Sequence, residues 1–473
     1  MLRELNASTA GKPQRPVRIL QFGEGNFLRA FADWMVDILN EKTGFNGNIQ
    51  IVQPLPDGMT DALNKQDCLY HVTLNGILQG KTFSDTRLIT SINGAINPYE
   101  NPAAFFEQAE NPELQFVISN TTESGIAFDV TDSHSATLAK SFPGKVTQLL
   151  WHRYNHFNGA ADKGLYFLPC ELIEKNADTL RTTIHQYIEL WNLPADFKLW
   201  VNEHNVFCNT LVDRIVPGFP KDTIDTIQKE LDYKDNLVVT AEPFHLWVIE
   251  APEAVSKAFP ADKAGLDVKF VSDLTPYRTR KVRILNGAHT ALVPVAYLRG
   301  LRTVKESVDD TITGKFIREA IFNEIVPTLE LPARELNQFA HDVIERFQNP
   351  FIRHELASIA LNSVSKFKVR VLPSLLTYYN QTGTLPERLV LSLTALILFY
   401  KGEWNGASTP LNDALEVIEH FKNAWNESSL EKTMHLILSN TDFWGTDLTR
   451  VKGLTNHIVN QVKSQSIMAL PVA

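Results

Sequence analysis

Three side chains in residues 281–290 (KVRILNGAHT) carry groups that could do chemistry together. Lys281, Asn286 and His289 follow one another at spacings of five and three residues. On an α-helix these offsets place all three within one arc of roughly 140°, with Lys281 and His289 on the order of 12 Å apart along the axis. An amine, an amide and an imidazole at such intervals suit a chain of hydroxylated carbons.

Acid–base chemistry is expected from the amine of this trio. A lysine serves as an acid or a base when burial or neighbouring cations lower its pKa toward neutrality. Arg278, Arg280 and Arg283 supply cations close in the sequence. Taken alone, such a trio is more often solvated surface, so the prediction of a catalytic helix depends on the rest of the chain.

A second motif lies near the N-terminus. Residues 17–22 (VRILQF) have the composition of a short buried strand, Gly23, Glu24 and Gly25 follow, and the next segment has helical periodicity. Strand, Gly-x-Gly and helix in this order are typical of dinucleotide binding. The first glycine makes the tight turn, the second admits the pyrophosphate, and the helix N-terminus attracts its charge.

The motif departs from the usual pattern at two places. Leu28 stands where a third glycine is common. The acid that binds the ribose is expected after the strand at residues 48–52, where Asp57 is the nearest candidate. A neutral or acidic region there is more compatible with NAD than with NADP.

The order of apolar segments predicts an α/β protein. Up to residue 262, short runs rich in Val, Ile and Phe alternate with helical stretches, which indicates βαβ units and a mostly parallel sheet. Residues 77–92 favour a hairpin insertion. The later part is dominated by long amphipathic stretches. We therefore predict a Rossmann-type NAD-binding domain in residues 1–262 and a mainly α-helical substrate and catalytic domain in residues 263–473.

Composition excludes several classes of function. The chain has 473 residues, 44% hydrophobic and 21% charged, as in ordinary soluble globular proteins. Its net charge of −9 disfavours nucleic acid and anionic membranes as partners. The N-terminal residues lack an apolar signal core, and the longest apolar run, near residues 390–400, is too short to span a bilayer. We expect a cytoplasmic protein with a small-molecule substrate.

Metal chemistry has little support in the sequence. His152 and His156 have a spacing that can ligate zinc from one helical face, but no Glu follows His152 as in metalloproteases. Cys68, Cys170 and Cys208 are isolated, and such cysteines are more often small buried residues. Because no compact ligand cluster is present, we predict no metal and an acid–base lysine instead.

Several segments, in the expected order, resemble the mannitol dehydrogenase family of polyol-specific long-chain dehydrogenases. They are residues 22–31 (FGEGNFLRAF), 118–125 (ISNTTESG), 207–217 (FCNTLVDRIVP), 241–250 (AEPFHLWVIE), 281–290 (KVRILNGAHT) and 349–352 (NPFI), the last followed by Ser365 and Lys366. The resemblance covers nearly the whole chain.

The resemblance implies a role for each matching residue. Lys281 would be the acid or base on the reacting oxygen, Asn286 would stabilise that oxygen, and His289 would orient the sugar chain. NAD would be the cofactor. The residues that would bind it are Phe22, Gly23, Gly25, Asn26, Phe27, Thr121, Thr122 and Glu123.

The substrate side departs from the polyol branch of the family. The Cys-Asp-Asn that is typical of the mannitol and fructuronate branches is replaced by Cys170, Glu171 and Leu172, which weighs against both. Leucine cannot donate a hydrogen bond, so the role of that Asn would pass to Asn176 or rest on Asn286 alone. A family arginine is replaced by Ser358.

Gln21 and Glu24, together with the segment at residues 168–176 (LPCELIEKN), resemble the branch of the family that acts on hexuronates and aldonates. A hexuronate also needs its carboxylate recognised, which favours a basic side chain. Candidates for this contact are Arg283, Arg353, Arg370 and Lys366.

Three alternatives remain open at this stage. The chemistry could act on another hexuronate, fructuronate, or on a neutral polyol such as mannitol. A non-catalytic nucleotide-binding sensor on the same scaffold is disfavoured, because it need not keep Lys281, Asn286 and His289 together. The sequence does not indicate the oligomeric state, and a monomer is compatible with it.

Overall fold

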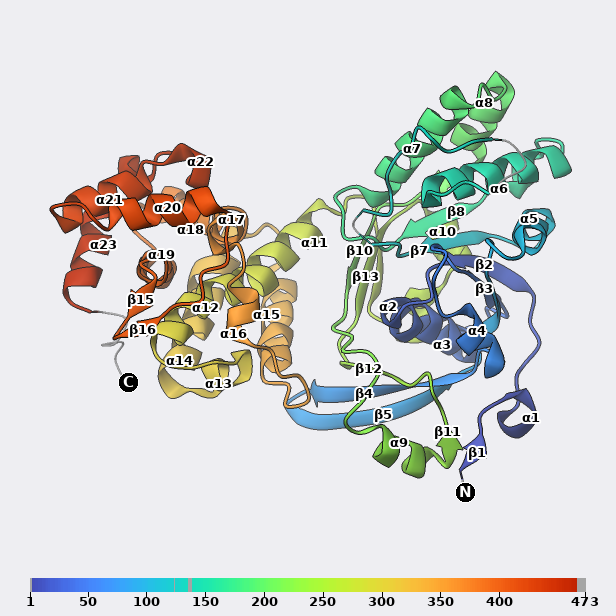
Figure 1. The fold of residues 1–473 in the computed structure, drawn as a ribbon, viewed down its shortest axis with the longest axis horizontal. Helices are drawn as coiled ribbons and strands as arrows, with labels where there is room; N and C mark the ends of the chain where they lie inside the picture. Colours follow the sequence, from blue (N-terminus) through green and yellow to red (C-terminus); the bar gives the residue numbers. More distant parts are fainter. Residues whose placement is uncertain (1, 123, 135–137, 466–473) are drawn as a thin grey trace. The chain divides into compact units, whose positions relative to one another are not determined.

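The computed structural model describes residues 2–122, 124–134 and 138–465. The chain divides into two compact units, the first made of Met1–Asn75 and Thr82–Leu274, the second of Gly76–Lys81 and Thr275–Ala473. The first is α/β and the second mainly helical (Figure 1), which confirms the predicted fold class. The first unit extends past the predicted boundary at 262, because a late strand still pairs with its sheet.

A six-stranded parallel sheet organises the first unit, in the order β6-β3-β2-β7-β8-β9. Its strands are β2 (Val17–Phe22), β3 (Asn48–Val52), β6 (Ile92–Ile96), β7 (Phe116–Ser119), β8 (Tyr166–Pro169) and β9 (Val206–Phe207). Both β3 and β7 are buried along their whole length. Burial on both faces is what a parallel sheet covered by helices requires.

Helices cover both faces of this sheet (Figure 1). The first-unit helices are α1 (Ala7–Ala10), α2 (Asn26–Leu28), η1 (Arg29–Asp33), α3 (Trp34–Lys42), α4 (Thr60–Lys65), α5 (Pro102–Glu110), α6 (Phe142–His156), η2 (Ala161–Lys163), α7 (Asn176–Leu190), α8 (Ala195–His204), α9 (Ile224–Leu231), α10 (Glu253–Ala258) and η3 (Ala261–Ala264). Alternation along β2 sends Ile19 into the core beneath α2 and α3, and Leu20 into the core beneath α5 to α8.

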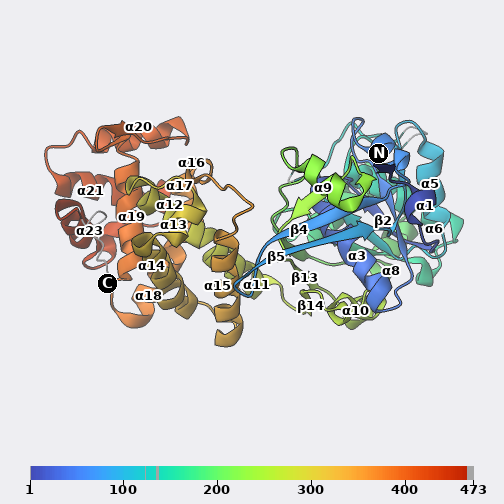
Figure 2. The same cartoon turned by 90° about the horizontal axis from the view of Figure 1, so that it is seen from below.

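Smaller sheets complete the first unit. They contain β1 (Arg3–Glu4) with β11 (Tyr233–Lys234); β12 (Val239–Ala241) with β4 (Tyr70–Leu78) and β5 (Lys81–Ile89); and β10 (Thr210–Asp213) with β13 (Leu246–Glu250) and β14 (Val268–Val271). The β4–β5 pair confirms the predicted hairpin (Figure 2). Its turn, Gln79 and Gly80, has positive φ at both residues, as a type I′ turn requires.

The second unit is built from helices. They are α11 (Thr275–Arg280), η4 (Lys281–Asn286), α12 (Gly287–Leu298), α13 (Val304–Asp309), α14 (Thr311–Glu319), η5 (Ala320–Ile325), η6 (Val326–Thr328), α15 (Ala333–Phe347), α16 (Leu356–Ile359), α17 (Ser363–Arg370), α18 (Leu372–Thr382), α19 (Glu387–Phe399), α20 (Leu415–Ala424), α21 (Leu430–Leu438), α22 (Thr441–Trp444), η7 (Leu448–Arg450) and α23 (Leu454–Lys463), with a small β15–β16 hairpin (Glu403–Trp404, Ala407–Ser408).

The apolar run near residues 390–400 forms the central helix α19 of this unit, and its residues are buried. The hairpin tip also belongs here, since the Glu345 carboxylate accepts hydrogen bonds from the backbone of Gln79 and Gly80. Within the described residues, no helix is long and apolar enough to cross a membrane.

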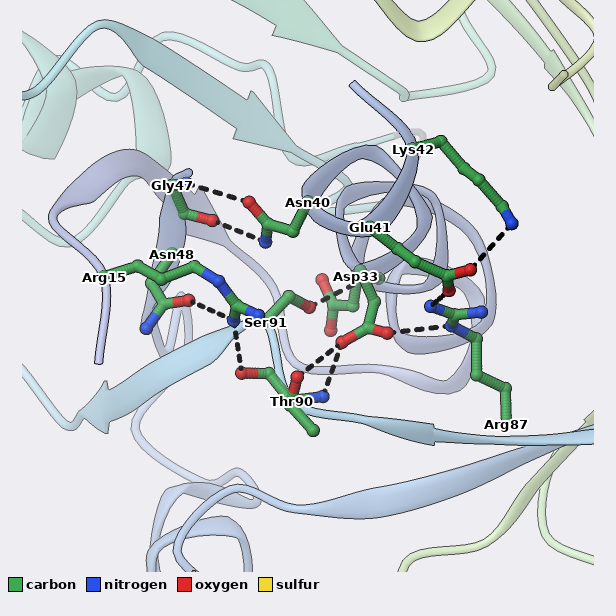
Figure 3. Close-up of polar contacts among 11 residues, drawn as sticks. Arg15, Asp33, Asn40, Glu41, Lys42, Gly47, Asn48, Arg87, Thr90 and Ser91 are labelled. Carbon is green, nitrogen blue, oxygen red and sulfur yellow. Dashed lines mark hydrogen bonds and ion pairs between the residues drawn. The ribbon is translucent and has the colours of Figure 1, made fainter. Parts of the chain in front are cut away.

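A buried carboxylate on α3 and a backbone oxygen of η1 join these helices to the end of β5 (Figure 3). The Asp37 carboxylate accepts hydrogen bonds from Arg87 Nε at 2.8 Å and from the Thr90 backbone N–H at 2.7 Å. Ser91 Oγ donates to the backbone oxygen of Asp33 at 2.9 Å. These contacts fix the helix that follows the glycine loop against the end of β5.

The ionisable side chain of Asp33 is fully buried. Its Oδ2 accepts a hydrogen bond from the Tyr70 hydroxyl at 2.7 Å. Burial raises the pKa of the Asp33 carboxyl to about 7, against the opposing effects of hydrogen bonds from Tyr70 and Gln21 and the charge of Arg29. The protonated form therefore fits this site better than the carboxylate does.

We predict that Asp33→Asn removes a pH dependence of stability. The stability that protonated Asp33 contributes is fully present below pH 3.8, its ordinary pKa, and is lost as the pH rises to about 7. Relative to the variant, the wild type should lose up to about 1.4 kcal/mol per pH unit in that window. Urea unfolding of both proteins at pH 4.5, 6 and 7.5 measures this difference. A difference independent of pH would contradict the assignment.

Candidate active site

The glycine loop of the first unit has the geometry that a dinucleotide needs. Gly23 has a φ of 122°, and a Cβ there would lie 3.0 Å from the Asn120 backbone oxygen. Gly23 is therefore required for the tight turn. Gly25 begins the helix, and a Cβ there would meet nothing within 4 Å. The backbone at Gly25 is open to a large group such as a pyrophosphate.

The residues around the loop divide into core and surface. Phe22 is fully buried and packs edge-on against Phe105 and Phe142, so its side chain belongs to the core and not to a cofactor contact as the sequence predicted. Leu28, in the place of the third glycine, is buried as well. These buried apolar side chains anchor the two ends of the glycine loop in the core.

Two further predicted cofactor residues follow at the start of the helix. Phe27 is half-buried and stacks on Phe31, with ring centroids 4.9 Å apart. Asn26 is exposed and accepts a hydrogen bond from Arg29 at 2.7 Å. Of the two, Asn26 is the more accessible to a ligand at the helix N-terminus.

An acidic side chain inside the loop was not assigned a role from the sequence. Glu24 is 9% exposed, and its Oε1 accepts a hydrogen bond from the Met59 backbone at 3.4 Å. Its other oxygen, Oε2, is buried and has no hydrogen-bond partner among the residues that the structure describes. Burial raises the pKa of the Glu24 carboxyl, while the Met59 N–H and Arg29 oppose this shift.

The neighbourhood that Glu24 reaches is the end of β3. Gln53, the last residue before the loop, donates to the backbone oxygens of Leu55 and Pro56 and accepts from Thr60, so its amide is fully used. Asp57, the acid expected from the sequence, is exposed. Glu24 is therefore a second acid at the place where Rossmann folds bind a ribose.

The end of β7 is held by a buried glutamate. Glu171 is 2% exposed, and it accepts hydrogen bonds from Ser119 Oγ at 3.0 Å and from the N–H and Oγ1 of Thr121 at 2.9 and 3.0 Å. Thr122 has a φ of 79°, an unusual value for a β-branched residue. Glu123, also predicted to bind the cofactor, lies outside the described residues.

Glu171 thus explains part of the altered Cys-Asp-Asn pattern, because it positions the strand end that borders the predicted nicotinamide site. The sequence signal was a charged residue that follows a buried strand with one residue, Cys170, between them. Leu172, which follows it, is 61% exposed.

Asn176 is not placed as predicted. It is 1% exposed, its Nδ2 donates to the backbone oxygens of Pro169 and Thr210, and its Oδ1 accepts from the Thr210 and Ala177 N–H groups. All of its hydrogen-bonding capacity serves the backbone. Asn176 therefore positions the ends of β8 and β10, and this differs from the substrate contact expected from the sequence.

In the second unit, Lys281 and Asn286 begin and end a π-helical turn, η4. Such a turn is closed by hydrogen bonds between residues five apart, as from Gly287 N–H to Val282 O. Residues five apart are then separated by about one turn. Lys281 and Asn286 therefore lie more nearly on the same side of the helix than they would in a regular α-helix. Both are half-buried, and π turns are frequent at functional sites.

Two contacts fix this turn. Just before it, Arg280 is 3% exposed and its guanidinium donates to Glu335 of α15 at 2.7 Å. Just after it, Gly287 lies so close to α17 that a Cβ would be 3.0 Å from the Arg370 backbone oxygen. The glycine of the NGAH motif is thus a packing requirement.

His289 is held between two rings that the sequence analysis did not single out. Phe347 stacks on it with ring centroids 4.1 Å apart, and His354 meets it edge-on at 5.0 Å. Burial lowers the pKa of His354, which favours its neutral form. Phe347 and His354 flank the NPFI segment, and that position was the only signal for them.

The four basic candidates for a carboxylate contact differ in their surroundings. Arg353 is exposed and ion-paired with Glu355 at 2.5 Å. Lys366 is half-buried and donates to the Ile359 backbone oxygen at 2.9 Å. Arg283 and Arg370 are half-buried as well.

The suspected metal ligands have other roles. His152 and His156 both face the Glu110 carboxylate, at 2.8 and 3.8 Å. Cys170 and Cys208 are buried free thiols. Over the described ranges, no group of three or more His, Cys, Asp or Glu side chains is arranged to hold a metal ion.

Comparison with known proteins identifies the family. Residues 17–263 match the mannitol dehydrogenase Rossmann domain, and residues 273–466 match the mannitol dehydrogenase C-terminal domain. The chain belongs to the mannitol dehydrogenase family and is an oxidoreductase.

Within the family, the chain is similar to proteins named altronate oxidoreductase. The protein from Phocaeicola vulgatus is 51% identical over 96% of this chain and 95% of its own length. The one from Yersinia enterocolitica is 46% identical over 98% of this chain and 97% of its own length.

Solved structures agree on the fold. A D-sorbitol dehydrogenase has a TM-score of 0.81 at 20% identity, covering 99% of this chain and 100% of its own. Pseudomonas fluorescens mannitol 2-dehydrogenase, solved with NAD and D-mannitol, has a TM-score of 0.66 at 23% identity. The match covers 99% of this chain and 95% of that structure's chain.

Proposed function

We propose that this chain is an NAD-dependent oxidoreductase that interconverts D-tagaturonate and D-altronate. The observation that carries the proposal is the π turn, which brings Lys281 and Asn286 onto one side of a helix that also bears His289. Support for the substrate comes from relatives at 44–51% identity that are named altronate oxidoreductase.

Each residue on the helix has a distinct task. Lys281, as an ammonium, donates a proton to the carbonyl oxygen during reduction, and as an amine it accepts that proton during oxidation. The Asn286 amide, which has no partner in the described part of the chain, donates to the same oxygen and stabilises its developing charge. His289, fixed by Phe347, holds a neighbouring hydroxyl and orients the sugar chain.

The residues of the glycine loop fit a nicotinamide dinucleotide, which supplies or accepts the hydride when bound. Gly23 makes the tight turn, Gly25 leaves room for the pyrophosphate, and Asn26 stands at the helix N-terminus that would face it. Glu24 favours NAD over NADP, since it lies beside the end of β3, where Rossmann folds bind the ribose, and a negative charge there would repel a 2′-phosphate.

A substrate panel tests the proposal. Purified protein is given NADH or NADPH together with tagaturonate, fructuronate or fructose, and turnover is followed by nicotinamide absorbance. We expect the highest kcat/KM with tagaturonate and NADH. Highest turnover of fructuronate or fructose would transfer the function to fructuronate reductase or a neutral polyol dehydrogenase. No turnover with any pair would favour a non-catalytic nucleotide-binding protein.

Lys281→Ala should abolish most of the turnover without affecting the cofactor. Loss of a positioned acid or base lowers kcat by about 10²- to 10⁴-fold, whereas NADH affinity, measured by fluorescence titration, should stay unchanged. Lys305→Ala is the matched control, because Lys305 lies on α13 in a surface ion pair with Asp309. Retained turnover in the Lys281 variant would remove the central assignment.

Glu24→Gln should weaken the discrimination between the two cofactors. The amide keeps the shape and can still accept a hydrogen bond, but it no longer repels a 2′-phosphate. We expect the NADH to NADPH ratio of kcat/KM to fall about 10- to 100-fold, since like-charge contacts cost several kcal/mol. Glu253→Gln, an exposed site on α10, is the control. A fall in Asp57→Asn but not in Glu24→Gln would assign the ribose contact to Asp57 instead.

A further inference from the structure

The end of β8 carries a buried carboxylate for which the protein supplies no paired cation. Glu171 is 2% exposed, and across the described residues it takes part in no ion pair. Two other buried carboxylates of the same unit differ in this respect. Asp37 pairs with Arg87 at 2.8 Å, and the charge of Arg29 acts on Asp33. The surroundings of Glu171 therefore leave a negative charge without a counter-ion.

The groups that face Glu171 favour its ionised form. Its Oε2 accepts a hydrogen bond from Ser119 Oγ, and its Oε1 accepts hydrogen bonds from the N–H and Oγ1 of Thr121. A carboxylate only accepts hydrogen bonds, whereas a protonated carboxyl would have a proton of its own to donate. Burial raises the pKa of Glu171, and the hydrogen bonds from Thr121 and Ser119 oppose this shift. The charge is thus stabilised by hydrogen bonds alone.

The order of strands indicates which half of the cofactor lies near this charge. A Rossmann fold binds a dinucleotide where the strand order reverses. Here β2 lies between β3 on one side and β7, followed by β8, on the other. The pyrophosphate belongs at the loop after β2, and the ribose of the adenosine belongs at the end of β3. The nicotinamide half then extends over the ends of β7 and β8.

Short contacts connect the glycine loop to Glu171. A Cβ at Gly23 would lie 3.0 Å from the backbone oxygen of Asn120, the residue directly after β7. The Asn120 side chain donates to the backbone oxygen of Cys170 at 2.8 Å. Glu171 is the next residue, and its carboxylate binds back to Thr121. The carboxylate therefore lies at the same edge of the sheet as the glycine loop.

We propose that Glu171 sets the relative affinity of the enzyme for the two oxidation states of its cofactor. The nicotinamide ring carries a positive charge in NAD⁺ and none in NADH, so a nearby carboxylate attracts only the oxidised ring. A buried charge without a counter-ion is costly, and a cationic ring relieves part of that cost. The inference rests on the NAD dependence proposed above and adds a residue that favours the oxidised cofactor.

Glu171→Gln tests the charge while it keeps the shape. The amide oxygen can still accept from Thr121, and the amide NH₂ can donate to the Ser119 hydroxyl, so the strand ends should stay in place. The Kd values of NAD⁺ and NADH are measured by isothermal titration calorimetry on the full chain without sugar. We expect the ratio of the NAD⁺ Kd to the NADH Kd to rise about 10-fold, as for unit charges about 10 Å apart at an effective dielectric constant of about 20.

Glu171→Asp separates this charge from the hydrogen bonds that hold the strand ends. Aspartate keeps the charge but is one methylene shorter, so both Kd values should rise together and their ratio should stay at the wild-type value. Glu189→Gln is the matched control, because Glu189 forms a surface ion pair with Lys198. It lies roughly 20 Å along α7 from the first residue of that helix, and its removal should change neither Kd.

The outcomes that would overturn the inference are distinct from failure of the proposed function. An unchanged ratio in Glu171→Gln, or a raised ratio in Glu171→Asp, would overturn it. A rise in Glu123→Gln without a rise in Glu171→Gln would also overturn it and assign the effect to Glu123. A wild type that binds neither NAD⁺ nor NADH would instead contradict the NAD dependence itself. The choice of sugar substrate does not enter these measurements.

Discussion

The register of the π turn at Lys281–Asn286 is the constraint on which the candidate active site depends. In an α-helix these two residues would point roughly 140° apart around the axis. The wider turn brings them about one turn apart on the same side. The ion pair of Arg280 with Glu335 fixes the residue directly before the π turn. Directly after the turn, the absence of a side chain at Gly287 lets the end of α17 pack against the helix. One local distortion of the helix therefore sets the relative positions of the proposed acid, Lys281, and the proposed amide, Asn286.

The first unit uses backbone strain in a comparable way. Thr122 has a left-handed φ, which costs on the order of 1–3 kcal/mol and is kept only where surrounding contacts impose it. The contacts are those of Glu171, whose buried carboxylate holds the preceding residue, Thr121, through two hydrogen bonds. Glu171 thus fixes the shape of the strand end, while Leu172 beside it is exposed and offers no hydrogen-bonding side chain.

Much of the fold could be predicted because its signals are local. Buried runs between helical stretches gave the parallel sheet, two glycines marked the loop after β2, and the hairpin was visible from residues 77–92. The errors concern side chains whose role depends on distant partners. Phe22 lies inside a recognisable motif but packs against Phe105 and Phe142, and Asn176 is used by the backbone of β8 and β10.

The sequence by itself determined the identity and order of the chemical groups: the glycine loop, Lys281, Asn286 and His289, and a set of basic residues near them. Only the tertiary structure decided which of these groups are already satisfied. Arg280 is paired with a residue 55 positions away, whereas Arg283, three residues later, has no partner in the described chain. Spacing along a chain cannot show this difference, because neutralisation of a charge depends on which segments the fold brings alongside it.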